Sequence, residues 1–345
     1  MRVMSEYRLI DLFAGVGGLS LAARSLGVPS VGIEWDQDAC STRRASGLAT
    51  VEGDVRDFCP ADFPDANVLV GGPPCQTFSA AGHGAGRRTL EAVQHSLRHM
   101  ANREKVPSRL AGMDDERRVL VLEPLRWALA ALDANRPYEA VVLEQVPAAL
   151  PVWEAVGDVL RVEGYSVAHG VLHAEEFGVP QTRRRAVLIA RRHGVAALPT
   201  PTHRRYHKGP SSPADGPSLL PPVTMGEALN RRRPFVLVSS YGSGGNPAVR
   251  GKRSSYQPAP TVTGKIGRSR VITEEGVESD RLTVAEAGRL QGFPDDHPWS
   301  GRGIFQQIAN AVPPPLAEHV LSAALAFDHN PAPSQLTVEV STQSA

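Results

Sequence analysis

Short apolar runs alternate with glycine-rich turns and helical patterns in the first 75 residues of the chain. The runs fall at residues 8–13, 30–34, 49–51 and 68–70. Runs of this length between turn signals are typical of buried strands. Strands that alternate with helices favour a parallel sheet covered by helices on both faces. The pattern therefore predicts an α/β fold built on a doubly wound, mostly parallel sheet.

Regular patterns return beyond residue 113. They predict a helix that Pro124 interrupts or kinks, then alternating strands and helices, at residues 114–133, 138–143, 152–162, 165–172 and 186–190. Near the end, Thr283 and Glu286 form a capping box that begins a helix ended by Gly292. A last helix is expected at residues 316–327.

Two segments lack this periodicity. Residues 80–112 combine glycines with arginines, and a loop of this length either has a function, such as closing over a polyanion, or is a solvated insertion. Residues 191–256 are rich in Pro, Gly, Ser and Arg, which is typical of an irregular basic module or of a flexible linker. We therefore divide the chain into a large domain at 1–190, a small inserted recognition domain at 191–280, a returning part at 281–328 and a disordered tail at 329–345.

The net charge of +1 conceals an uneven distribution. Residues 191–270 hold 14 Lys and Arg against 2 Asp and Glu, so the remainder of the chain holds 23 against 34. A basic segment on an acidic body is expected of a module that binds a polyanion. Arginine outnumbers lysine 33 to 4, which suits bidentate contacts to phosphate and guanine, although a G+C-rich genome produces the same bias.

Other features indicate the compartment. No run approaches the roughly 18 apolar residues that span a bilayer, and the first eight residues, which include Arg2, Glu6 and Arg8, lack the apolar region of a signal peptide. We therefore expect a cytoplasmic protein. The three cysteines have no metal-ligand spacing, which argues against a disulfide framework and against a zinc site.

The first strand leads into the turn Ala14-Gly15-Val16-Gly17-Gly18, where the backbone can approach a ligand closely. The full Gly-x-Gly-x-x-Gly spacing fails, because Ser20 occupies its third position. Glu34 ends the second strand, where a carboxylate can bind ribose hydroxyls, and Trp35 beside it covers an adenine or packs in the core. Asp54 follows the third strand, and its carboxylate can accept a hydrogen bond from adenine N6 or stabilise a turn. We predict a cofactor that contains adenosine.

Cys75 follows the fourth strand through Pro73 and Pro74, so its thiol is a candidate nucleophile on a stiff turn. A lone cysteine is more often a small buried hydrophobe. Glu144 ends the next predicted strand at the same sheet edge and can act as an acid there. Arg183 and Arg185 alternate on one strand, and that face holds either phosphate or a base carbonyl, or is a solvated basic edge.

Six motifs in order closely resemble the DNA (cytosine-5)-methyltransferases. They begin at Asp11, Gly72, Glu144, Gln181, Arg289 and Asn310, and read DLFAGVGG, GPPCQTFS, EQV, QTRRR, RLQGFPD and NAVPP. The resemblance covers residues 9–327 except the basic module, which corresponds to that family's variable target-recognition domain. It implies the Rossmann-like fold of S-adenosylmethionine-dependent methyltransferases.

The resemblance also implies a mechanism: Cys75 adds to C6 of a cytosine flipped out of double-stranded DNA, with Glu144 at N3, and C5 takes a methyl group from S-adenosylmethionine. It makes Cys75, Glu144, Arg183 and Arg185 the catalytic residues. The implied cofactor site comprises Phe13, Ala14, Gly15, Gly17, Gly18, Glu34, Trp35, Asp54, Val55, Pro74, Asn310, Ala311 and Val312. Contacts to DNA are expected from Gln76, Ser79, Gln181, Arg87 and Arg88.

The chain departs from the family at one position beside the catalytic glutamate, because Gln145 stands where an asparagine is usual. A tRNA cytosine-5 methyltransferase and a catalytically silent DNA-binding relative are the alternatives, and the broken glycine spacing disfavours a nicotinamide oxidoreductase. A monomer is expected. It would act in a restriction-modification system with a cognate endonuclease, or as an orphan or phage-type enzyme.

Overall fold

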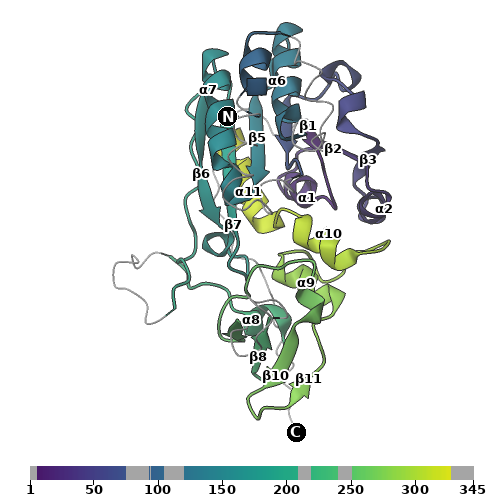
Figure 1. Cartoon of the computed structure of the whole chain (residues 1–345), viewed down its shortest axis with the longest axis vertical. Coiled ribbons are helices and arrows are strands. Elements are labelled where there is room, and N and C mark those ends of the chain that lie inside the picture. The colour runs from purple at the N-terminus through teal and green to yellow at the C-terminus, as the bar shows by residue number, and fades with distance from the viewer. Residues whose placement is uncertain are drawn as a thin grey trace.

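The computed structural model describes residues 6–74, 93, 95–104, 120–208, 219–239 and 251–327. Figure 1 shows a large unit around one sheet and a smaller unit around a second sheet, with α10 (Ile304–Asn310) between them. In the part of the chain that is described, no helix has the length and apolar character required to cross a membrane.

Seven strands form the large sheet in the order β3-β2-β1-β4-β5-β7-β6. They span β1 Leu9–Leu12, β2 Ser30–Glu34, β3 Ala49–Glu52, β4 Val68–Gly71, β5 Ala140–Gln145, β6 Ser166–His173 and β7 Arg184–Arg191. The neighbours from β3 to β5 pair in parallel, whereas β7 runs antiparallel to both β5 and β6. The mostly parallel α/β fold predicted from the sequence is confirmed.

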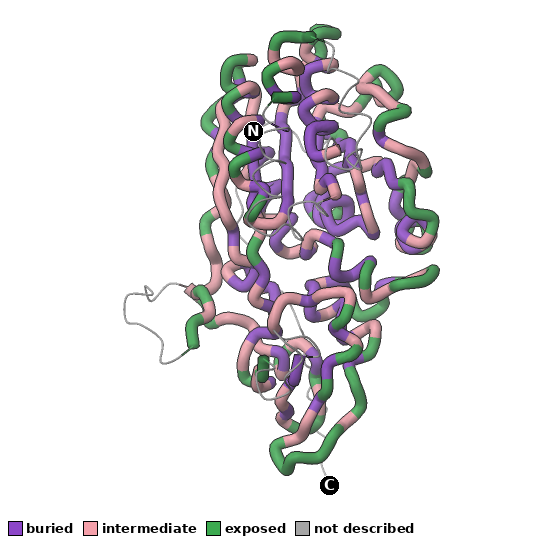
Figure 2. The backbone as a smooth tube through the Cα atoms, viewed as in Figure 1, coloured by how far each residue is buried: buried purple, intermediate pink, exposed green. Residues whose placement is uncertain are grey.

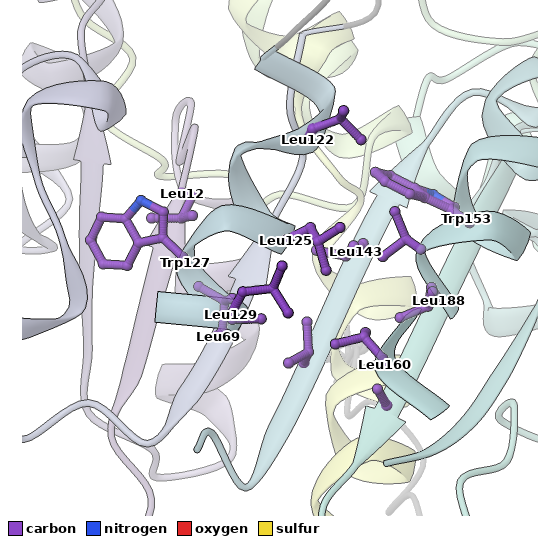
Figure 3. Packing of buried hydrophobic residues seen from close by; sticks show 14 of the residues in the cluster. Leu12, Leu69, Leu122, Leu125, Trp127, Leu129, Leu143, Trp153, Leu160 and Leu188 are labelled. Carbon is purple, nitrogen blue, oxygen red and sulfur yellow. The ribbon is translucent and has the colours of Figure 1, made fainter. Parts of the chain in front are cut away.

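Alternate residues of each central strand enter different cores, as the two-residue period of a strand requires. In β5, Val141 and Leu143 face a core formed by α6 (Glu123–Asp133) and α7 (Leu150–Val162). Figure 3 shows Trp127 and Trp153 in this core, and Figure 2 shows the buried residues concentrated along the strands. Ala140 and Val142 face the opposite core, which α1 (Gly18–Ser25) and α11 (Pro314–Leu325) cover.

Prolines begin helices here instead of breaking them. Pro124 lies in the first turn of α6, so the kink expected at that position is absent and the helix starts there. Proline is tolerated in a first turn because the amide it lacks would have no intrahelical partner. Residues 114–119 of the expected helix lie outside the described residues, and Leu120–Leu122 form a 3₁₀ turn.

The smaller unit has a regular sheet in place of the irregular module that its composition suggested. Four antiparallel strands are ordered β11-β10-β8-β9 and span Glu278–Ser279, Arg270–Thr273, Phe235–Val238 and Lys252–Ser254. The strands β9 and β11 consist of exposed or half-buried polar residues, which hid them from pattern analysis, and in the short β10 Val271 is the buried residue.

The core of the smaller unit extends beyond residue 280. It includes Ala287 and Leu290 of α9 (Val284–Leu290) and Ile308 of α10, together with Met225 of α8 (Met225–Leu229) and Phe235. The expected division placed residues 281–310 with the large domain. Side chains of α9 and α10 pack on the small sheet, whereas Phe293 packs against Val16 and Leu21 of the large unit, and α11 then enters the large core.

Candidate active site

The parallel strands bring the predicted site residues to one edge of the large sheet. Leu12 of β1 is paired with Ile33 on one side and with Gly71 on the other, and Gly71 is paired with Leu143. Residues that follow these positions, among them Glu34, Gly72 and Glu144, therefore lie along the same edge. Ligands commonly bind at this edge of open α/β sheets.

The turn after β1 is held in a left-handed conformation. Phe13, Gly15 and Gly17 have φ angles of 58°, 52° and 99°. A Cβ built on Gly18 would lie 2.0 Å from the carbonyl oxygen of Val312, so residue 18 must be glycine for the two segments to meet.

Glu34 locks this turn onto the end of β2. Its carboxylate accepts from the backbone N–H groups of Gly15 at 2.7 Å, Trp35 at 3.0 Å and Asp36 at 2.9 Å. Burial raises the pKa of Glu34, and these backbone donors oppose the rise. The carboxylate predicted to bind ribose thus lies beside the glycine turn.

Ser20 explains the broken glycine spacing. The side chain is buried, and its hydroxyl donates to Oδ2 of Asp11 at 2.8 Å. A glycine at position 20 would leave this buried carboxylate without its hydroxyl donor. Serine replaces the third glycine of the dinucleotide motif because its hydroxyl joins α1 to the buried Asp11 carboxylate of β1.

The remaining residues of the predicted cofactor site have different surroundings. Trp35 is 65% exposed, which excludes core packing and leaves its ring free to cover a ligand. Asp54 caps the 3₁₀ helix Val55–Asp57 and pairs with Arg56 at 2.7 Å, and the hydrogen bond from Arg56 holds its pKa below the ordinary value. Asn310 accepts from Gln306 at 2.7 Å. Pro74 is the last described residue before the loop.

Glu144 and Arg185 face one another in the interior. Oε1 of Glu144 lies 2.7 Å from Nε of Arg185, and the two side chains are 10% and 13% exposed. The approach lacks hydrogen-bond geometry, and among described residues this oxygen has no hydrogen-bond partner. The arrangement is a buried carboxylate that faces a cation, and one of its oxygens accepts no hydrogen bond from the described residues.

The end of β4 lies against this carboxylate. A Cβ built on Gly72 would lie 3.5 Å from Oε2 of Glu144. The amide of Gln145 donates to the carbonyl of Pro73, and its Oε1 accepts from N–H of Val146 at 2.5 Å. The glutamine that replaces the usual asparagine therefore fixes the turn that precedes Cys75.

Arg183 and Gln181 have surroundings that differ from those expected. Arg183 is 2% exposed and donates to the carbonyls of Val262, Ala309 and Ala311 at 3.3, 2.8 and 3.3 Å. Its guanidinium is thus inside the protein and not on a face open to phosphate, and burial lowers its pKa to about 9.

Gln181 is completely buried. Its Nε2 donates to Leu290 and Gln291 at 2.7 and 2.6 Å, and its Oε1 accepts from Val262 at 2.9 Å. Both amide atoms have protein partners, in place of the expected DNA contact: Gln181 joins the segment before β7 to α9 and Val262 of the small unit.

The predicted nucleophile and the segment after it lie outside the described residues. This applies to Cys75, Gln76, Ser79, Arg87 and Arg88. Sequence reasoning overlooked Arg43, which is fully buried beneath the glycine turn. Its spacing from Ala39 and Cys40 was the available signal, because it places Arg43 on the buried face of α2 (Gln37–Ala45).

Known proteins are similar to this chain in sequence, and solved structures are similar to it in fold. Type II methyltransferase M.HaeII of Haemophilus aegyptius is 30% identical, and the alignment covers 85% of this chain and 84% of that protein. M.SsoII of Shigella sonnei, also a Type II methyltransferase, is 28% identical over 92% and 80% of the two chains. A crystal structure of a Spodoptera frugiperda DNMT2 mutant has a TM-score of 0.60 at 13% identity, covering 92% of this chain and 99% of that one, and shares the fold.

A sequence model described as C-5 cytosine-specific DNA methylase matches residues 7–221 and 222–325. These two segments contain all the described elements. The family resemblance found in the six motifs is therefore confirmed over residues 7–325. The chain is a methyltransferase that belongs to the C-5 cytosine-specific DNA methylase family.

Proposed function

We propose that this enzyme transfers a methyl group from S-adenosylmethionine to C5 of a specific cytosine in double-stranded DNA, with Cys75 as nucleophile. The observation that carries the proposal is the junction of β4 and β5. There the turn that leads into Cys75 lies against the Glu144 carboxylate, and Arg185 holds that carboxylate from the other side at 2.7 Å.

C5 of cytosine is a weak nucleophile until the aromatic ring is broken. The Cys75 thiolate adds to C6, and the electrons displaced onto N3 form a bond to the proton that Glu144 donates, which leaves Glu144 as a carboxylate. In this proposal, Arg185, which lies 2.7 Å from Glu144, orients that carboxyl group and donates to the base O2. After methyl transfer, a base such as water takes the C5 proton, its bonding electrons form the C5–C6 double bond, and the sulfur leaves C6 as the thiolate. The proton on N3 returns to the Glu144 carboxylate.

The residues at the other end of the edge fit an adenosine-containing cofactor. Gly15 has no described atom within 4 Å of the position of a Cβ, so the turn opens onto free space, and the exposed Trp35 and the Glu34 carboxylate flank the same region. When bound, S-adenosylmethionine supplies an electrophilic methyl group on its sulfonium. In this proposal, Glu34 holds its ribose hydroxyls and Trp35 covers the adenine.

A covalent trap tests the proposal. DNA carrying 5-fluorocytosine at the target keeps fluorine at C5 after methyl transfer, so the adduct cannot collapse. We expect a denaturation-resistant complex with the wild type and none with Cys75→Ala. Failure of the folded wild type to form it in the presence of methyl donor would contradict the mechanism.

A methyl-transfer assay distinguishes a DNA substrate from a tRNA substrate. The basic content of residues 191–270 supports a duplex DNA substrate over tRNA, and methyl transfer to both substrates in parallel tests this choice. Wild-type methyl transfer would exclude a silent DNA-binding relative. The Type II names of the two relatives support a restriction-modification setting, with a cognate endonuclease of the same specificity.

A further inference from the structure

A buried arginine supports the glycine turn from beneath. Arg43 is 0% exposed, and its guanidinium donates to the Ala14 carbonyl, the Ser20 hydroxyl, the Ala49 carbonyl and the Thr50 hydroxyl at 3.1 to 3.2 Å. The acceptors come from the glycine turn, α1 and β3. One cation thus connects the turn to two other parts of the large unit.

Two glycines make room for this side chain. A Cβ on Gly32 would lie 2.1 Å from one terminal nitrogen of Arg43, and a Cβ on Gly17 would lie 3.0 Å from the other. Gly32 is inside β2, where glycine is otherwise unfavourable. Its presence is explained by the close approach of the guanidinium.

The counter-charge is Asp11 on β1. Its carboxylate is buried, and the Ser20 hydroxyl donates to it while accepting from Arg43 at 3.1 Å. Burial raises the pKa of Asp11 to about 6, and Arg43 opposes that rise. Asp11, Ser20 and Arg43 therefore form one buried polar group.

A single peptide unit connects this group to the cofactor site. The carbonyl of Ala14 accepts from Arg43 at 3.2 Å and from N–H of Gly17 at 2.9 Å. The N–H of the same peptide, on Gly15, donates to Glu34 at 2.7 Å. Arg43 thus fixes the orientation of the peptide whose other end fixes the Glu34 carboxylate.

We propose that Arg43 is a positioning residue for cofactor binding, acting through the Ala14–Gly15 peptide on Glu34. This inference rests on the proposed function. Without the guanidinium the peptide can rotate, the N–H leaves Glu34, and the carboxylate loses its alignment toward a ribose. The effect belongs to the adenosine part of the ligand and not to the transferred methyl group.

The test measures the dissociation constant of S-adenosylmethionine for purified, folded variants. We expect Arg43→Met to weaken binding at least ten-fold and Arg43→Lys to weaken it less, because an ammonium can reach only some of the acceptors. S-adenosylhomocysteine should lose affinity by the same factor. The KM for DNA should stay within two-fold. The matched control is Arg44→Met, since Arg44 is a neighbouring exposed arginine paired with Glu52 at 2.8 Å.

Two further variants keep the test independent of folding. Arg43→Met combined with Asp11→Asn avoids an unpaired buried carboxylate, and Ser20→Ala removes one acceptor with little change in volume. The second should weaken cofactor binding about three-fold. Wild-type-like affinity in all folded variants would overturn the role of Arg43, whereas a wild type that binds no S-adenosylmethionine would overturn the proposed function instead.

Discussion

Single side chains in this protein have surroundings that their neighbours in sequence do not reveal. Arg183 and Arg185 belong to one basic run, yet Arg183 donates to backbone carbonyls inside the molecule while Arg185 faces Glu144. The partners of Arg183 are about 80 and 130 positions further along the chain. The motif assigned both arginines to the candidate site. The structure shows that Arg183 bonds backbone carbonyls, whereas Arg185 contacts Glu144.

Gln145 provides a test at this scale. Replacing it with asparagine, the usual residue of the family, shortens the side chain by one methylene and breaks its contact with the Pro73 carbonyl. The turn before Cys75 then loosens, so we expect the single-turnover methylation rate to fall several-fold. Affinity for cofactor should be unchanged. The exposed Gln37→Asn is the control, and an unaltered rate in Gln145→Asn would show that this contact is dispensable.

His297 predicts a pH dependence of stability. Its ring packs against those of Phe293 and Trp299, with centroid distances of 4.8 and 4.3 Å, and burial lowers its pKa to about 4. Between pH 6.5 and 4 the unfolded chain binds a proton that the folded chain does not, so this histidine lowers the unfolding free energy as the pH falls.

At pH 5 the loss relative to pH 7 is at most about 2 kcal/mol from this residue. Denaturant unfolding at the two pH values measures it. The variant His297→Phe should show a smaller decrease than the wild type. Equal decreases in the two proteins would mean that His297 does not titrate in this range.

At the scale of helices and strands, the sequence predicted the elements better than their arrangement. Runs such as β4 and β5 are short, apolar and bounded by turn residues, so their positions were clear. The antiparallel direction of β7 could not be predicted, because hydrophobic periodicity does not indicate the direction of a strand. The polar strand β9, Lys252–Ser254, has no apolar face to reveal it.

The contact between α1 and the segment before α11 can be tested by adding one methyl group. Gly18→Ala places a carbon 2.0 Å from the Val312 carbonyl, which is backbone and cannot move aside freely. We expect a loss of about 1–3 kcal/mol in unfolding free energy and weaker cofactor binding. Gly251→Ala meets only ordinary contacts, the nearest at 3.6 Å, and serves as the control. A Gly18→Ala protein as stable as this control would contradict the close approach.

For the molecule as a whole, the residues around β7 join the two units. Gln181 contacts Leu290 and Val262, and Arg183 contacts Val262 and Ala309, so one short segment holds both the small sheet and the returning helices. These bonds are buried and directional. They explain why two motif residues are polar even though they lie far inside the protein.

Gln181→Ala should therefore destabilise the folded protein more than a surface change does. It removes the Gln181 partner of three buried groups, the Leu290 carbonyl, the Gln291 side-chain oxygen and the Val262 N–H, at a cost of about 2–4 kcal/mol. Chemical denaturation of the variant, with the exposed Gln37→Ala as control, measures the difference. A change below about 0.5 kcal/mol would show that the segment does not hold the units together.

The small core shared by α9 and α10 has a consequence for chimaeric enzymes. Grafting residues 191–280 from a relative would exchange Met225 and Phe235 but retain Ala287, Leu290 and Ile308, the side chains packed against them. Such a graft juxtaposes two halves of a core that never evolved together. Moving the crossover downstream to the prolines at 313–315, where the chain enters α11, transplants that core whole.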